Sequence, residues 1–294
     1  MRIPLPALST LLATFIVALS ATAASMAAEP ARPATAGPGV HVLAQRLAMP
    51  GLGRERTLRL YLPPSYDTAP ARRYPVIYMH DAQNLFDDAT SYAGEWGVDE
   101  TLDDFARTRG FEAIVVGIDH GGEERLHELS PWTNPKYGMA QGERYMAFVV
   151  DVVKPFIDAH YRTRPGRAST AIIGSSMGGL ISHYALLRYP QVFGKAAIFS
   201  PSYWYSGEVY AQTRTHPWPR GTRTYFYIGG REEEESVPDV DRMIALLGTQ
   251  DHAPGDITVH VEPEAQHNER AWRAELPRAV AWLFELPPAD AAKP

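Results

Sequence analysis

The chain has 294 residues, of which 45% are hydrophobic and 11% are aromatic, and its formal net charge at pH 7 is −6. This length and apolar content suffice for one large core, and the acidic balance argues against nucleic acid or anionic lipid as a partner. Because the sequence contains no cysteine, neither disulfides nor lipidated thiols contribute to its stability or to membrane attachment.

Residues 1–28 have the composition of a secretory signal peptide. A single charge, Arg2, precedes the apolar run 11–19, and small residues follow as far as Ala28. A membrane anchor needs about 20 apolar residues, so this shorter run predicts cleavage between Ala23 and Ala28. We therefore expect a periplasmic or secreted protein without stable membrane insertion after signal cleavage.

The rest of the chain is expected to hold one folded domain. Residues 29–40 are rich in Pro, Ala and Gly, which predicts a disordered linker. Strand and helix patterns then alternate from 41 to 287 without a repeat or a second boundary, and 288–294 are expected to form a C-terminal tail.

The order of elements predicts an α/β fold. Two early segments, 41–48 and 56–62, are expected to be edge strands. Short apolar runs typical of central parallel strands follow at 75–80, 113–118, 170–174, 195–199, 224–229 and 257–261, and helical patterns lie near 97–108, 143–160, 177–189, 238–248 and 269–285. This alternation indicates about eight mostly parallel strands flanked by helices, with ligands bound beyond the carboxyl ends of the strands.

A Gly-x-Ser-x-Gly motif runs from Gly174 to Gly178, between the apolar run 170–174 and the helical pattern 177–189. This context is typical of a nucleophile elbow, in which a strained turn lifts a serine hydroxyl clear of the sheet. Ser176 is therefore the predicted nucleophile. A β-carbon at Gly174 or Gly178 is expected to collide where strand and helix come closest. The competing interpretation is a plain Gly/Ser turn.

His267 is the predicted general base. It follows the last predicted strand and precedes the terminal helix, on a loop at the carboxyl edge of the sheet. His183 is excluded, because it lies seven residues along the helix from Ser176, roughly 10 Å along the axis. His80 ends the third predicted strand and is expected to belong to a wall or to the oxyanion loop.

The acid of the site is expected between the serine and the histidine, after the strand that ends at Gly229. Four glutamates, 232–235, follow that strand. A run of four is ordinarily a solvated surface, and Glu232, the first to leave the strand, is best placed to turn inward. Glu233 is the alternative.

Two backbone amides are expected to form an oxyanion hole. One is that of Met177, after the nucleophile and at a helix N-terminus. The second is expected in the loop after the third strand, from Ala82 or alternatively from Gln83. Asp81 in the same loop could indicate a metal ligand or a second acid, but no companion ligands stand at metal spacing.

Aromatic residues near strand ends are candidates for substrate contact. Trp204 above all, with Tyr203 and Trp96, could form a wall for a sugar or phenolic group, although such residues are often simply buried. Arg125 and Glu128 could hold a substrate carboxylate, but pairing that fixes their loop is the favoured interpretation.

Three segments carry a resemblance to a known family: RYPVIYMHDAQNLF at 73–86, IGSSMGG at 173–179 and FSPSYW at 199–204. Together they resemble the putative esterase family of α/β-hydrolases, which includes enterochelin-esterase-like proteins, carbohydrate esterases, esterase D and mycolyltransferases. The similarity covers roughly residues 41–285. It implies a single-domain α/β-hydrolase fold.

The resemblance also implies a Ser/His/acid triad, which corresponds here to Ser176, His267 and Glu232. Related members often have Gly where Ala82 stands, and others have Asp at the acid position. The expected function is an exported serine esterase that works through an acyl-enzyme, without cofactor or metal, on an acylated sugar, a phenolic ester or a siderophore lactone. Acyl transfer with the same triad and a catalytically silent binding module are the alternatives.

Overall fold

The computed structural model describes residues 32–288, which belong to one compact unit. The expected signal peptide, the first residues of the expected linker and residues 289–294 of the expected tail lie outside this range. Within it, every helix is too short or too polar to cross a membrane.

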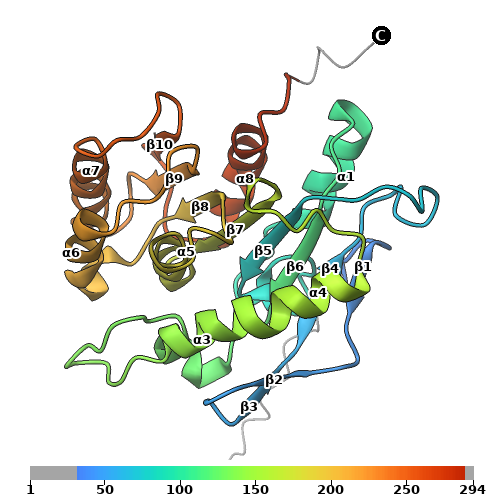
Figure 1. Ribbon diagram of the computed structural model, residues 1–294, viewed down its shortest axis with the longest axis horizontal. Coiled ribbons are helices and arrows are strands. Elements are labelled where there is room, and N and C mark those ends of the chain that lie inside the picture. The colour runs from blue at the N-terminus through green and yellow to red at the C-terminus, as the bar shows by residue number, and fades with distance from the viewer. Residues whose placement is uncertain (1–31, 289–294) are drawn as a thin grey trace, which may run out of the picture. The chain divides into compact units, whose positions relative to one another are not determined.

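An eight-stranded sheet forms the centre of the unit (Figure 1). In spatial order its strands are β1 (Val40–Val42), β4 (Leu58–Tyr61), β6 (Ile114–Ile118), β5 (Val76–His80), β7 (Thr170–Ser175), β8 (Lys195–Phe199), β9 (Arg223–Gly229) and β10 (Ile257–Glu262). Strands β5 to β10 pair in parallel, whereas β1 and β4 are antiparallel to their neighbours. The expected α/β class with mostly parallel strands is confirmed.

The expected edge strand 41–48 consists of two short strands in different sheets. Its first part is β1, and its second part, β2 (Leu47–Met49), pairs with β3 (Arg54–Arg56) in a separate two-stranded sheet. Gly51 and Gly53, with φ of 75° and 64°, turn the chain between β2 and β3. This turn folds β2 back onto β3 and so removes it from the edge of the central sheet.

The expected helices are all present. They are α1 (Val98–Arg109), α3 (Gly142–Phe148) continued through a π-helical turn (Val149–Val153) into α4 (Lys154–His160), α5 (Met177–Arg188), α7 (Ser236–Leu247) and α8 (Glu269–Leu283). The short α2 (Arg125–Glu128) and α6 (Glu208–Thr215) were not predicted. Helix α6 buries only Val209, Tyr210 and Thr213. Because Thr213 is polar, the apolar pattern of this helix is weak in the sequence.

The helices cover both faces of the sheet (Figure 1). Side chains alternate along each strand, so Val76 and Tyr78 of β5 join one apolar core while Ile77 and Met79 join the other. The first core contains residues of α3 to α7, and the second contains residues of α1 and α8, which lie side by side. The carboxyl ends of the six parallel strands meet at one edge.

The segment 32–39 differs from the disorder expected for 29–40. Arg32 donates to the carbonyls of Ser91 and Tyr92, and the amide of Gly37 donates to Asp99 at 2.7 Å. A Pro- and Ala-rich segment buries little apolar surface, but here its backbone and polar groups form hydrogen bonds with the loop that precedes α1 and with the first turn of α1.

Candidate active site

Ser176 stands at the sharp turn between β7 and α5. Its φ of 58° and ψ of −123° are rare for a residue with a side chain, so the turn is strained. The amide of Ser176 donates to the Phe199 carbonyl at 3.0 Å and ties the turn to β8. The serine thus lies at the carboxyl edge of the sheet, where it lines a cavity of about 450 Å³.

Glycines permit this turn at two positions, one of which differs from the expectation. A β-carbon at Gly174 would lie 2.6 Å from the backbone of Gly178, and a β-carbon at Gly179 would lie 2.8 Å from the Phe199 carbonyl oxygen. At Gly178 the nearest atom would be 3.4 Å away, which is an ordinary contact. The prediction of a collision at Gly178 is therefore wrong, because the close approach of α5 to β8 occurs at Gly179.

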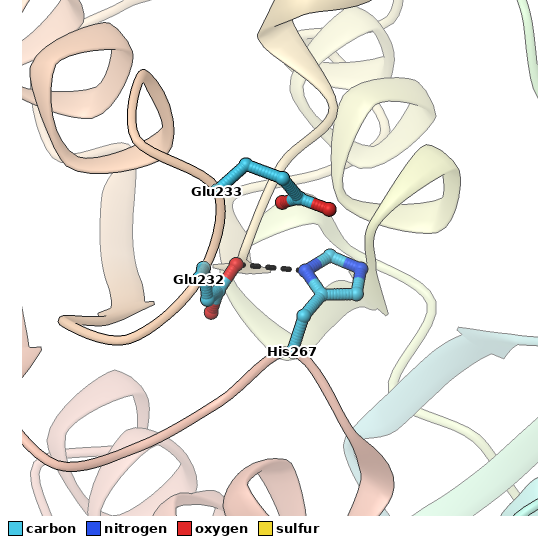
Figure 2. A group of neighbouring side chains, drawn as sticks. All are labelled: Glu232, Glu233 and His267. Atoms are coloured by element: carbon cyan, nitrogen blue, oxygen red, sulfur yellow. Dashed lines mark hydrogen bonds and ion pairs between the residues drawn. The ribbon is translucent and has the colours of Figure 1, made fainter.

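The structure pairs His267 with Glu232 (Figure 2). The Nδ1 atom of His267 lies 2.7 Å from Oε2 of Glu232. The side chain of Glu232 is 1% exposed and that of His267 is 31% exposed, so the carboxylate is buried behind the imidazole. An ionised carboxylate can accept hydrogen bonds but cannot donate them. Nδ1 of His267 therefore carries the proton, and Nε2 is left to accept one.

Further donors fix the carboxylate of Glu232. Its Oε1 accepts from the Gly229 amide at 2.9 Å and from the Ser200 hydroxyl at 2.6 Å. Glu233, the alternative acid, is exposed, and its carboxylate lies above the imidazole without a hydrogen bond to it (Figure 2). Glu232, Glu233 and His267 offer ligand atoms within 4.8 Å of one another. Since both oxygens of Glu232 already have donors, the group suits an acid–imidazole pair better than a cation site.

Ser176 and His267 line the same cavity but are not hydrogen-bonded to each other among the described residues. The Ser176 hydroxyl instead lies 3.2 Å from the Ser202 hydroxyl, whose backbone amide donates to the Ser176 carbonyl at 3.1 Å. Catalytic hydrogen bonds are often loose without substrate. Ser200 and Ser202 were missed as site residues, although their position directly after a predicted strand was a usable signal.

The expected oxyanion amides occupy two adjoining loop ends. Met177 is the first residue of α5, where backbone amides lack partners within the helix. Ala82 opens a 3₁₀ turn, Ala82–Asn84, directly after Asp81, which adopts the left-handed conformation with φ of 58°. A β-carbon placed on Gly178 would lie 3.4 Å from side-chain atoms of both His80 and Asp81. The loop after β5 therefore contacts the first turn of α5.

Asp81 forms an ion pair that fixes its loop. Its carboxylate pairs with Arg125 through two bonds of 2.6 and 2.9 Å. Burial tends to raise the pKa of Asp81, but Arg125 outweighs it and the pKa lies below its ordinary value. Arg125 and Glu128 do not pair with each other, because Glu128 binds Arg54 and Arg56 of β3. The expected pairing of Arg125 with Glu128 is therefore wrong: each residue forms ion pairs with other partners, and Arg125 also lines the cavity of Ser176.

The three aromatic candidates have different surroundings. Trp96 lines the cavity of Ser176, and its ring packs edge-on against Phe199. Trp204 is 53% exposed and lines a separate pocket of about 290 Å³ together with Glu233. Tyr203 is only 1% exposed, and its hydroxyl bonds Nδ1 of His183 at 2.7 Å. The expected substrate contact of Tyr203 is therefore wrong, because a buried hydrogen bond holds it inside.

Two buried histidines, His80 beside the cavity and His183 within α5, are neutral at pH 7. His80 bonds the Tyr145 hydroxyl through Nδ1 and lines the cavity, as a wall residue should, whereas His183 is bonded through both ring nitrogens. Burial lowers the pKa of His80 from 6.5 to about 4 and that of His183 from 6.5 to about 3.

Acid should therefore destabilise the fold through these histidines. The unfolded chain binds more protons than the folded one below pH 6.5, so stability is lost as the pH falls. For His80 the loss builds up between pH 6.5 and about 4 and reaches about 3 kcal/mol. Urea unfolding across this range should show the slope, and His80→Gln should flatten it. An equal slope in that variant would contradict the prediction.

A strained serine at the carboxyl edge of a parallel sheet, beside a histidine–glutamate pair, defines the architecture of an α/β-hydrolase. The family model described as "Putative esterase" matches residues 50–283, and the chain belongs to this family. Membership supports an enzyme that hydrolyses ester bonds.

Relatives and solved structures agree with this assignment. An uncharacterised protein of Bacillus subtilis, YbbA, is 28% identical over 246 residues, which cover 78% of this chain and 92% of that protein. The BES protein from Bacillus cereus has a TM-score of 0.70 at 20% identity and covers 84% of this chain and 95% of its own. The enterobactin esterase FES from Shigella flexneri has a TM-score of 0.70 at 19% identity, over 85% of this chain and 60% of its own. At these identities the structures show the shared fold.

Proposed function

We propose that the protein is a serine esterase whose triad is Ser176, His267 and Glu232. The observation that carries the proposal is the shared cavity, which is lined by both the strained serine and the histidine whose Nδ1 is held by a buried carboxylate. With Nδ1 engaged, Nε2 of His267 is the atom that takes the proton of the Ser176 hydroxyl. In the reacting complex, the Ser176 hydroxyl rotates away from Ser202 and donates its proton to Nε2 of His267.

The chemistry follows from these roles. The Oγ of Ser176 attacks the acyl carbon, its proton passes to His267, and the amides of Met177 and Ala82, or of Gln83, hold the negative oxygen. The imidazolium then protonates the leaving alcohol, which departs from the acyl-enzyme. Water then attacks the acyl carbon and gives a proton to His267. The bond between Oγ of Ser176 and the acyl carbon breaks, the imidazolium returns its proton to Oγ, and the acid leaves. One ester and one water thus yield one acid and one alcohol.

The cavity supports a small carboxylic ester as substrate. Its volume of about 450 Å³ falls within the range of small-molecule pockets, about 300–1,000 Å³. Trp96, Tyr92 and Leu85 supply an apolar lining, and His120 and Arg125 supply polar groups. Related proteins are named for esters of ferulic acid and of siderophores, which fit the same class. We infer that an aromatic or short acyl half occupies this cavity.

We also infer export, on the basis of the charge, apolar run and small residues before Ala28. One experiment tests both proposals. A fluorophosphonate probe should label a single serine, Ser176, in protein recovered from the periplasm or the medium, because only an activated hydroxyl reacts quickly. Peptide mapping should find the adduct on Ser176 and an N-terminus between Ala24 and Glu29. An adduct on another serine would refute the nucleophile, and an intact Met1 would refute export.

A further inference from the structure

Trp272 contacts the imidazole of His267 directly and the carboxylate of Glu232 through Ser200. It lies in the first turn of α8, is 5% exposed and lines the cavity of Ser176. Its ring meets the His267 ring edge-on, with centroids 5.0 Å apart and an angle of 84°. Its indole Nε1 donates to the Ser200 hydroxyl at 2.9 Å.

The direction of this hydrogen-bond chain is fixed by chemistry. An indole N–H can only donate, so the oxygen of Ser200 accepts from Trp272, and the proton of Ser200 points to Oε1 of Glu232. Together with the Gly229 amide, the relay supplies two donors to Oε1. The rotation of the carboxylate is thereby set, and Oε2 faces Nδ1 of His267.

The backbone at Ser200 supports a positional role. Ser200 is 2% exposed and has a φ of 43°, a left-handed conformation that disfavours a side chain. Its amide donates to the Tyr227 carbonyl at 2.7 Å, so the residue is anchored to β9. A strained, buried serine persists where the surroundings impose it, and here they direct its hydroxyl between Trp272 and Glu232.

We propose that Trp272, acting through Ser200, is a positioning residue that holds Glu232 in the orientation required by His267. This inference rests on the proposed function. Trp272→Phe keeps an aromatic ring against His267 but removes the indole N–H together with part of the buried ring, a loss of volume that the control below shares. It should lower kcat about five- to tenfold and leave KM within about twofold. Ser200→Ala removes the donor to Glu232 itself and should lower kcat about 10- to 100-fold.

A matched control comes from the same helix. Trp282 of α8 packs against Tyr225 and under Arg223 and does not line the cavity. Trp282→Phe removes an indole N–H in the same way and should leave kcat and KM unchanged. In the Ser200→Ala background, Trp272→Phe should have no further effect on kcat, because the relay is already broken. Equal losses in both tryptophan variants, or losses that multiply in the double variant, would overturn the proposal.

A spectroscopic measurement separates positioning from the proposed function. The Nδ1–H proton of His267, assigned by its loss in His267→Gln, should give a downfield NMR resonance in the wild type. Trp272→Phe should move it upfield or broaden it, whereas Trp282→Phe should not. An unchanged resonance in Trp272→Phe would overturn the positioning role. If the wild type hydrolyses no ester while the resonance responds as described, positioning stands and the esterase proposal fails.

Discussion

Ser176→Ala should abolish ester hydrolysis while the protein stays folded. Loss of a triad serine lowers kcat by about 10⁶-fold in a serine protease, and the same is expected here because Ser176 occupies the strained residue of the turn, whereas Ser175 belongs to the preceding strand. The fold should persist, since among residues 32–288 the side chain makes one hydrogen bond, of 3.2 Å, with Ser202. Steady-state hydrolysis of p-nitrophenyl acetate and butyrate, with a melting curve for each variant, provides the measurement.

The adjacent Ser175 is the matched control. It ends β7, is 6% exposed and has ordinary strand conformation, so Ser175→Ala should lower kcat less than about tenfold. The proposal fails if Ser176→Ala retains a few per cent of activity or if the two variants change places. If the wild type hydrolysed none of the esters tested, the esterase proposal would fail, and the alternative of a binding protein with the hydrolase fold would be favoured.

Glu232→Gln should be the second most damaging change. An amide at this position can present its NH₂ group to Nδ1 of His267, which favours the tautomer with the proton on Nε2, and that nitrogen then cannot accept the serine proton. The precedent of an aspartate-to-asparagine change in a serine protease indicates a loss in kcat of about 10⁴-fold. The volume and the contacts with Gly229 and Ser200 should largely remain.

Glu233→Gln distinguishes the two candidate acids. Glu233 is exposed and bonds only the Ser236 hydroxyl, at 3.2 Å, among the described side chains. Its substitution should change kcat by less than about threefold, and stability by no more than about 0.5 kcal/mol. A large loss in Glu233→Gln with Glu232→Gln nearly silent would move the acid by one residue. If neither variant loses activity, the carboxylate comes from elsewhere in the chain.

Local patterns accounted for much of the fold. Apolar runs of five or six residues predicted β5 to β9 within one or two residues, because strands buried on both faces leave a continuous apolar signal. The sixth run, expected to be central, is β10, which lies at the edge of the sheet and is only partly buried. The same reasoning failed for α6, where the burial of Thr213 depends on its bond to His183 from another helix. It failed again at the first edge strand, because a turn at Gly51 and Gly53 redirects the chain.

The sequence by itself determined the α/β class and the elbow at Ser176, since each depends on residues close together in the chain. Glu232 and His267 were predicted only from their positions after the ends of strands. Only the tertiary structure decided the burial of Tyr203, the role of Gly179 and the relay from Trp272 to Glu232. Trp272 and Ser200 stand 72 residues apart, and nothing local in either segment encodes their contact. Such contacts arise when strands β8 and β9 and helix α8 pack together, and packing of distant segments leaves no periodic signal in the sequence.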